Sequence, residues 1–451
     1  MTMKKQNLRY MKWIGKMIVL LFIFNFQFSI FDCSAQRVSL DECLEKALES
    51  NFSIKIIRNE ARMDKNNLNY STFLPTLEGT AKQTQTRNDM KTENSAGEVN
   101  KMSDVKTDNY TAGVALNWRI FDGLEMFTTH EKQKELLAMG ELAVQQAVEN
   151  LILNVSAAYY NVLVQHHKLM AARHSLELSN ERYDEARVRY KIGNRSGLEA
   201  QQAKIDLNTD SSTYVRQKEA LKSAYITLNK LMNTDLQMVN YVQDTILLGP
   251  QLVLGTLEQK TLAGNTTLLI AKKDQKISAL DLKNARAVLF PTLDFNSGYN
   301  YNKTDTPSSS TTLNRSNGFY WGFSLNVPIF SRLQNRTKIK NAKLELENTE
   351  LSYQEAEKET LGDLALMYNS YENNLLMVNF EIESASVAEA NLDAALEKYK
   401  IGSLSGIEFR EFQRSYIDAV DRKLSAIYQA KVSELSLLLL SGDIRGSFVV
   451  E

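Results

Sequence analysis

The chain contains a long internal duplication. Three short motifs occur twice in the same order: Pro-Thr-Leu, Ile-Phe and Tyr-Lys-Ile-Gly. The first recurs after 216 residues and the other two after 209 residues. They end at Leu77 and Leu293, at Phe121 and Phe330, and at Gly193 and Gly402. A duplication of this length means that each half is one structural unit, so the fold is predicted half by half.

Each half ends in a long helical stretch with a coiled-coil repeat. From Leu151 to Tyr190 the seam residues recur at spacings of four and three, and the second half repeats the pattern with one lapse, at Glu381. Both seams break at Tyr-Lys-Ile-Gly and then resume. A continuous helix from Asp122 to Tyr190 is about 100 Å long at about 1.5 Å per residue. A protein that bridges two membranes uses such a length, whereas a soluble domain of this size does not.

Two short segments with alternating polarity precede each helical stretch. The alternation predicts strands over 76–86, 110–120, 293–301 and 319–329. Their length matches the roughly 9 to 11 residues of a tilted strand that crosses a bilayer. An antiparallel sheet packed on a soluble core also alternates, so that alternative stays open. The side chains that we expect to face lipid are Leu116, Trp118, Phe295, Tyr299, Trp321 and Phe323.

Four strands cannot close a barrel by themselves, because the smallest barrels have about eight. Only a closed barrel satisfies the backbone of strands in lipid, so the barrel must be shared between copies. Two copies give eight strands and a filled interior, and three give twelve. The sequence predicts a mainly α fold with a small β part. We expect duplicated long coiled-coil helices and four transmembrane strands per protomer that contribute to a shared trimeric, twelve-stranded barrel.

The N-terminus predicts a secretory signal peptide over 1–35. Basic residues precede the apolar run Met17–Ile30, and Ala35 offers a small residue for cleavage. A membrane anchor is disfavoured because the run is shorter than about 20 residues. Cys33 raises a lipoprotein alternative, which Asp32 beside it disfavours. After cleavage Cys43 is the single cysteine, so no intrachain disulfide can form. The remaining chain has no apolar stretch of membrane-helix length.

The duplication also sets the expected boundaries. We expect a first repeat over 36–232, an inter-repeat equatorial segment over 233–257, a second repeat over 258–440 and a C-terminal tail over 441–451. The segments 88–108 and 304–318 are polar and show no periodicity. They are predicted to be extracellular loops.

No pattern of residues points to catalysis. The chain has no phosphate-binding glycine loop, nucleophile elbow or cysteine pair for zinc. A net charge of -1 gives no indication of a basic surface that would bind nucleic acid. The four histidines lack spaced carboxylate or cysteine partners, so a solvent-facing role is favoured over metal binding: His130, His166, His167 and His174. We therefore predict no enzyme activity, no cofactor and no metal site.

The duplicated plan resembles the TolC-type outer-membrane efflux protein family. The resemblance rests on the order of the repeated motifs and covers the chain from about Val38 to the C-terminus. It implies a homotrimer in the outer membrane of a Gram-negative bacterium, in contact with lipid, whose helical tunnel crosses the periplasm. It also implies docking to a periplasmic adaptor and an inner-membrane pump. Such channels export drugs, metals or proteins without catalysing a reaction.

The resemblance assigns roles to residues near the two Tyr-Lys-Ile-Gly breaks. Gly193 and Gly402 match the turn glycines at the periplasmic tips, where an adaptor docks. A family arginine that helps to hold the entrance shut is missing, since Leu404 stands at its place. Glu408 and Glu411 match acids that narrow the entrance, although two carboxylates three residues apart also suit a plain solvated helix face. The full set of entrance residues is Arg195, Glu199, Tyr399, Glu408 and Glu411.

Two other classes of protein remain as alternatives. A periplasmic adaptor also uses a coiled-coil hairpin, but it would carry one hairpin and compact β domains. A soluble coiled-coil scaffold leaves the aromatic strand residues, such as Trp118 and Trp321, unexplained. The passive conduit is therefore the favoured prediction.

Overall fold

The computed structural model describes residues 37–93, 95–193, 196–239, 241–242, 245–307 and 312–447. The predicted signal peptide and Cys33 lie outside the described residues, as does the end of the predicted tail. The chain forms two compact units. One contains the described parts of Met1–Ala47 together with Asn154–Leu247 and Met377–Gln429. The other contains Leu48–Leu153, Leu248–Leu376 and the described parts of Ala430–Glu451, so each sequence repeat contributes to both units.

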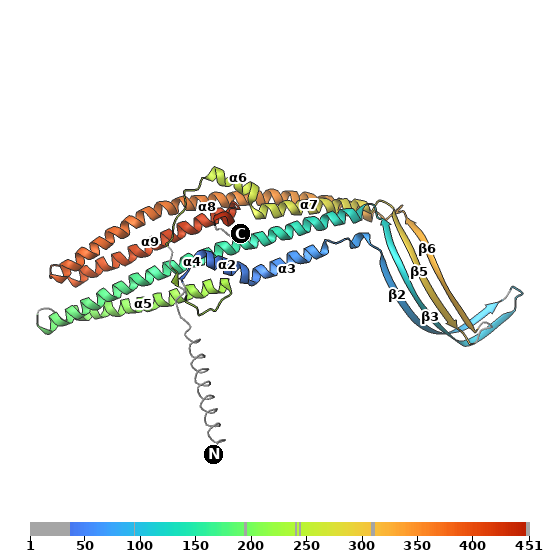
Figure 1. The fold of residues 1–451 in the computed structure, drawn as a ribbon, viewed down its shortest axis with the longest axis horizontal. Coiled ribbons are helices and arrows are strands. Elements are labelled where there is room, and N and C mark those ends of the chain that lie inside the picture. The colour runs from blue at the N-terminus through green and yellow to red at the C-terminus, as the bar shows by residue number, and fades with distance from the viewer. Residues whose placement is uncertain are drawn as a thin grey trace, which may run out of the picture. The chain divides into compact units, whose positions relative to one another are not determined.

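The order of elements repeats along the chain (Figure 1). The first half contains β1 (Arg37–Val38), α2 (Leu40–Ser50), α3 (Phe52–Asn67), the 3-10 turn η1 (Ser71–Phe73), β2 (Thr76–Glu93), β3 (Val99–Phe121), α4 (Glu125–Lys191), α5 (Gly197–Met232) and β4 (Tyr241–Val242). The second half contains α6 (Leu254–Gly264), α7 (Thr266–Ala287), β5 (Thr292–Asp305), β6 (Leu313–Asn326), α8 (Gln334–Lys400), α9 (Gly406–Leu440) and η2 (Ile444–Ser447). Helices α4 and α8 are each 67 residues long, and both end at the predicted breaks.

Burial along α8 follows the predicted heptad. Leu364, Tyr371, Val378, Ala385 and Leu392 recur every seven residues, and all of them are buried. This is the seam position of a coiled coil, which faces the partner helix on every second turn. The lapse at Glu381 has a partner as well: its carboxylate accepts a hydrogen bond from Arg422 Nε of α9 at 3.0 Å. In the part of the chain that is described, no helix combines the length and the apolar character needed to cross a membrane.

The four long strands form one antiparallel sheet in the order β2-β3-β5-β6. Within one chain, β2 and β6 are edge strands. The register aligns Trp118 with Phe295 and Phe295 with Phe323, so the three share a face. All six side chains that the sequence predicted to face lipid lie on this face: Leu116, Trp118, Phe295, Tyr299, Trp321 and Phe323. The opposite face is polar and includes the ion pair between Arg119 and Asp294, at 2.9 Å.

The apolar face is open in the single chain. Trp321 is 65% exposed and Phe323 is 62% exposed. Aromatic side chains of this size normally dominate a core, and a sheet packed on a soluble core would bury them. The exposure therefore disfavours the soluble-core alternative for this sheet.

All four strands extend beyond their predicted ends on the side away from the helices. Most of the segment 88–108, predicted to be a loop, belongs to β2 and β3, which pair from Thr76 to Glu93. Part of 304–318 likewise belongs to β5 and β6, and β6 ends at Asn326 rather than at Ile329. Polar cross-strand contacts maintain the ladder there, such as the 2.8 Å hydrogen bond from Gln85 to Asp108. Because polar residues predominate on both faces in this part, hydrophobic alternation could not mark it as strand.

Candidate functional site

Two tight turns join the long helices. Gly193 follows α4 with φ of 76°, and Gly402 follows α8 with φ of 82°. The N–H of Gly193 donates to Tyr190 O at 3.0 Å, and that of Gly402 donates to Tyr399 O at 3.0 Å. This left-handed conformation is the one that glycine adopts without a steric penalty when it ends a helix. A Cβ at either glycine would meet no atom within 4 Å, so the requirement is one of backbone conformation rather than of space.

The helices that follow the turns begin with side-chain caps. Ser196 Oγ accepts a hydrogen bond from Leu198 N at 3.2 Å. At α9, Ser405 Oγ accepts from Glu408 N at 3.3 Å, and Glu408 Oε2 accepts from Ser405 N at 2.9 Å. The second arrangement is a capping box, which satisfies two backbone donors reciprocally. Glu408 is therefore bonded to the start of its own helix, and these bonds to the Ser405 hydroxyl and backbone lower its pKa.

Tyr399 lies at the centre of an apolar cluster just before the second turn. Its ring stacks on Phe409 with the centroids 5.2 Å apart, and the Arg189 guanidinium lies 5.2 Å from its centroid. Burial raises the pKa of the Tyr399 hydroxyl, which has no hydrogen-bond partner among the described residues. Leu404, which stands where the family arginine was expected, packs against this cluster.

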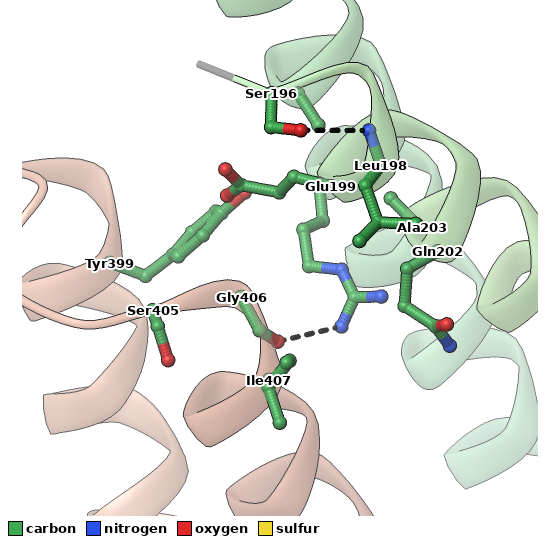
Figure 2. A pocket seen from close by; sticks show the side chains of 11 residues that line it. Ser196, Leu198, Glu199, Gln202, Ala203, Tyr399, Ser405, Gly406 and Ile407 are labelled. Carbon is green, nitrogen blue, oxygen red and sulfur yellow. Dashed lines mark hydrogen bonds between the residues drawn. The ribbon is translucent and has the colours of Figure 1, made fainter.

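A pocket of about 340 Å³ lies beside this cluster (Figure 2). Tyr399 and Glu199 both line this pocket, and Glu199 lies near the start of α5. Figure 2 shows the Tyr399 ring pointing toward the side of the pocket that carries Glu199. Glu408 and Glu411 do not line this pocket, and both are exposed on α9. Arg195, the fifth residue predicted at the entrance, lies outside the described residues.

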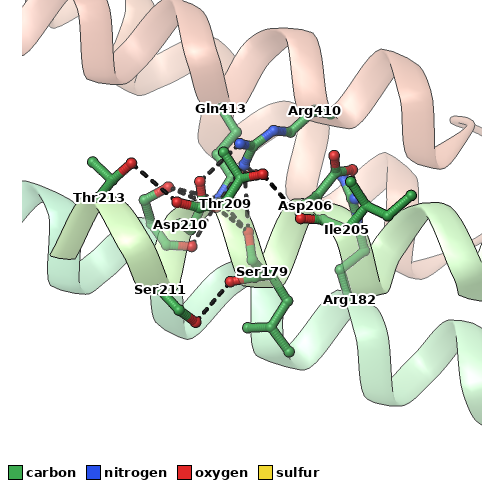
Figure 3. A network of polar contacts seen from close by, with 12 residues as sticks. Ser179, Arg182, Ile205, Asp206, Thr209, Asp210, Ser211, Thr213, Arg410 and Gln413 are labelled. Carbon is green, nitrogen blue, oxygen red and sulfur yellow. Dashed lines mark hydrogen bonds and ion pairs between the residues drawn. The ribbon is translucent and has the colours of Figure 1, made fainter. Parts of the chain in front are cut away.

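A polar network that the sequence did not predict joins the two helical hairpins (Figure 3). Arg410 of α9 donates to Asp210 of α5 through two hydrogen bonds, of 2.6 and 2.7 Å. Asp210 also accepts from Ser179 of α4. Gln413 of α9 donates to Ser175 O of α4 at 2.8 Å. The network thus connects α4 and α5 with α9, and Asp210 and Gln413 within it are buried.

A second link lies closer to the turns. Arg182 of α4 pairs with Asp206 of α5, and its Nη1 donates to Gly406 O of α9 at 3.2 Å. Figure 3 shows Arg182 beside Asp206. A buried charge with a good partner is held strongly, because removal of the partner leaves an uncompensated charge. Arg410 therefore fastens one hairpin to the other through its ion pair with Asp210. Arg182 does so through its hydrogen bond to Gly406 O, since its ion pair with Asp206 lies within one hairpin.

Histidine, cysteine and carboxylate side chains of the described residues are the possible metal ligands. Within the described ranges, no group of three or more His, Cys, Asp or Glu residues could hold a metal ion. Cys43 is buried, and His130 stacks on Tyr70 with the ring centroids 5.4 Å apart.

Comparison with known proteins agrees with this architecture. The sequence model of the family described as Outer membrane efflux protein matches residues 43–234 and 257–443. The chain belongs to the outer membrane efflux protein family. Family membership removes the adaptor and scaffold alternatives. The sequence is 20% identical to the outer membrane protein TolC of Escherichia coli, over 74% of this chain and 69% of TolC.

Other members of the family support the same assignment. The cation efflux system protein CusC of Escherichia coli is 23% identical, over 71% of this chain and 70% of CusC. The crystal structure of the Campylobacter jejuni CmeC outer membrane channel matches with a TM-score of 0.75 at 18% identity, over 90% of this chain and 86% of CmeC. The fold is therefore that of an outer membrane efflux channel, with a small four-stranded sheet on long helices.

Proposed function

We propose that three copies of this chain form a passive channel in the outer membrane, with a shared barrel of twelve strands. The observation that carries the proposal is the sheet. It has one exposed aromatic face, one polar face and two unpaired edges, β2 and β6. Unpaired backbone groups are costly in lipid, so both edges require a partner strand. Three copies supply twelve strands, which leaves room for an aqueous lumen lined by the polar face.

The helices provide the second part of the conduit. At about 1.5 Å per residue, 67 residues of α4 or α8 span about 100 Å, enough to carry the lumen across the periplasm. The turns at Gly193 and Gly402 are then the tips that dock to a periplasmic adaptor and an inner-membrane pump. The pump supplies the energy, and the channel performs no chemistry of its own.

The network near the turns is the proposed latch of the entrance. Arg410 and Arg182 take over the role that the family arginine would have at Leu404. Arg410 of the α8–α9 hairpin contacts the α4–α5 hairpin, and Arg182 of the α4–α5 hairpin contacts the α8–α9 hairpin. Opening therefore requires these contacts to break. Glu411 on the exposed face of α9 narrows the closed entrance, and Glu408 adds its charge from the capping box.

Planar-bilayer recording on the purified protein tests the proposed function. We expect discrete ion-conducting steps from protein extracted from the outer-membrane fraction. A matched preparation of the Phe323→Arg variant should give fewer insertions, because it places a charge on the proposed lipid face. Protein that fractionates away from the outer membrane and gives no conductance would refute the proposal.

A further inference from the structure

Two cations lie directly opposite each other near the far end of the sheet. Lys303 of β5 is the cross-strand partner of Arg315 of β6. Like charges in directly opposite positions destabilise a sheet unless an anion lies between them. Neither side chain forms a salt bridge within 4.0 Å to any residue that the structure describes. Lys303 instead lies over the Tyr110 ring, 5.2 Å from its centroid, and Arg315 is exposed.

The other charges on this face do not neutralise the pair. Lys106 already pairs with Asp108 at 3.1 Å, and Arg87 pairs with Asp104 at 3.6 Å. Asp305 is two residues beyond Lys303 on the same strand, opposite Leu313. It forms no salt bridge with the described part of the chain. Asp108, the cross-strand partner of Asp305, also attracts Lys303. Three cations, Lys106, Lys303 and Arg315, therefore share the carboxylates of Asp108 and Asp305, and the patch keeps a positive excess.

The position of the pair relative to the aromatic face identifies the ligand. Along β5 the pair follows Tyr299 and Tyr301, which alternate with polar residues and lie on the same face as Trp321. Asn317, opposite Tyr301, donates to the Tyr299 hydroxyl at 2.7 Å. Aromatic side chains of membrane proteins gather at the level of the lipid headgroups. Cations immediately beyond such a belt lie at the height of the headgroup phosphates.

We propose that Lys303 and Arg315 bind the phosphate of an anionic lipid headgroup in the outer leaflet. The proposal rests on the proposed function, which places this face in lipid. The leaflet follows from the chain: β5 and β6 meet the helices at Thr292 and Asn326, and the cation pair lies at the other end of both strands. A guanidinium binds two phosphate oxygens with its planar fork, and an ammonium adds a point charge. The phosphate supplies the anion that the opposed cations lack.

The test measures lipids retained by the purified protein. Wild type and the Lys303→Gln, Arg315→Gln double variant are reconstituted with phosphatidylcholine and phosphorylated lipid A, and bound lipids are counted by native mass spectrometry. The control is Lys82→Gln. Lys82 lies at the same height on the polar face, because its partner Thr111 pairs with Asn302, next to Lys303.

We expect wild type and Lys82→Gln to retain phosphorylated lipid A, and the double variant to retain at least tenfold less. Lipid A without phosphates should not be retained by any of the three. Equal retention by wild type and the double variant would overturn the inference, as would displacement of the lipid by inorganic phosphate at an equal concentration, which would indicate a site for free anions. Failure of the proposed function is distinguishable, because it would show as protein absent from the outer membrane before any lipid is measured.

Discussion

The Arg410 guanidinium meets both carboxylate oxygens of Asp210, at 2.6 and 2.7 Å, and so joins α9 to α5. The side chains are 16% and 9% exposed, so the pair is largely withdrawn from water. Ser179 of α4 adds a hydroxyl donor to the same carboxylate. This contact links the two helical hairpins near their turns, where we propose that the channel opens.

Replacement of Arg410 with Gln should loosen the closed entrance. Loss of one partner of a buried ion pair costs about 3 kcal/mol, because the other charge stays buried without compensation. Planar-bilayer recording should show a resting conductance several-fold above wild type, while the barrel still inserts.

The control for this prediction is Arg422→Gln. Arg422 pairs with Glu381 at 3.0 Å, but both residues belong to the α8–α9 hairpin, so the pair does not join the two hairpins. Its removal should leave the resting conductance unchanged. Equal conductance in the Arg410→Gln variant and wild type would show that the latch lies elsewhere.

The turn glycines should be intolerant of a β-branched residue. Gly193→Val or Gly402→Val forces a side chain into positive φ, at a cost of about 1–2 kcal/mol. Export of a dye from intact cells should be lost while trimers remain in the membrane, because the proposed docking turn is distorted. Gly362→Ala is the matched control: it lies inside α8 with no atom within 4 Å of the added Cβ, and it should export normally. Full export by both valine variants would place the docking tips elsewhere.

The two faces of the sheet should respond differently to the same charge. Phe323→Arg near the bilayer midplane should cost about 2–4 kcal/mol and reduce the amount of assembled protein. Ser324→Arg points to the polar face, where Ser324 is the cross-strand partner of Asp294, and should be tolerated. The thermal stability of each variant is measured as the loss of the trimer band on a gel with increasing temperature. Equal losses for the two variants would contradict the assignment of the lipid face.

The sequence predicted the turns and the sheet faces for clear physical reasons. A glycine that follows a long seam is a local signal, and Gly193 and Gly402 do hold positive φ. Alternation is also local, so it placed Trp321 and Phe323 on one face. It could not locate the ends of β2 and β3, because the pairing of Gln85 with Asp108 carries no hydrophobic signal.

The contacts of the proposed latch could not be predicted, because the residues that form them are distant in the chain. Asp210 and Arg410 are 200 residues apart, and periodicity marks a polar seam position without naming its partner. Ser179 continues the four-three spacing that begins at Leu151, so the spacing marks a polar seam residue without identifying its partner. The capping role of Glu408 could have been predicted from the sequence, because Ser405 lies three residues before it, as in a capping box.

The entrance carboxylates should make the closed pore cation-selective and sensitive to block by divalent cations from the periplasmic side. Glu408→Gln with Glu411→Gln removes the charge of both residues while a glutamine keeps the capping box. Selectivity and block should both weaken in planar-bilayer recordings. Block that persists in the double variant would move the ring to other residues, with Glu199 the next candidate.

The capping bonds of Glu408 also predict a pH dependence. Because hydrogen bonds to Ser405 lower the pKa of Glu408 in the folded protein, its contribution to stability is present above the unfolded pKa. That contribution is lost as the pH falls through the lower, folded value. The part of the block by divalent cations that depends on the Glu408 charge should therefore persist to a lower pH than it would for a glutamate with an ordinary pKa. A titration of block against pH measures this, and loss at the ordinary glutamate pKa would contradict it.

The most direct test of the shared barrel is the stoichiometry of the native particle. Native mass spectrometry of protein extracted from the outer-membrane fraction should find three chains per particle, because β2 and β6 leave two edges that only neighbouring copies can pair. Three chains with no smaller folded species is the predicted result. A stable particle of one or two chains would contradict the twelve-stranded barrel.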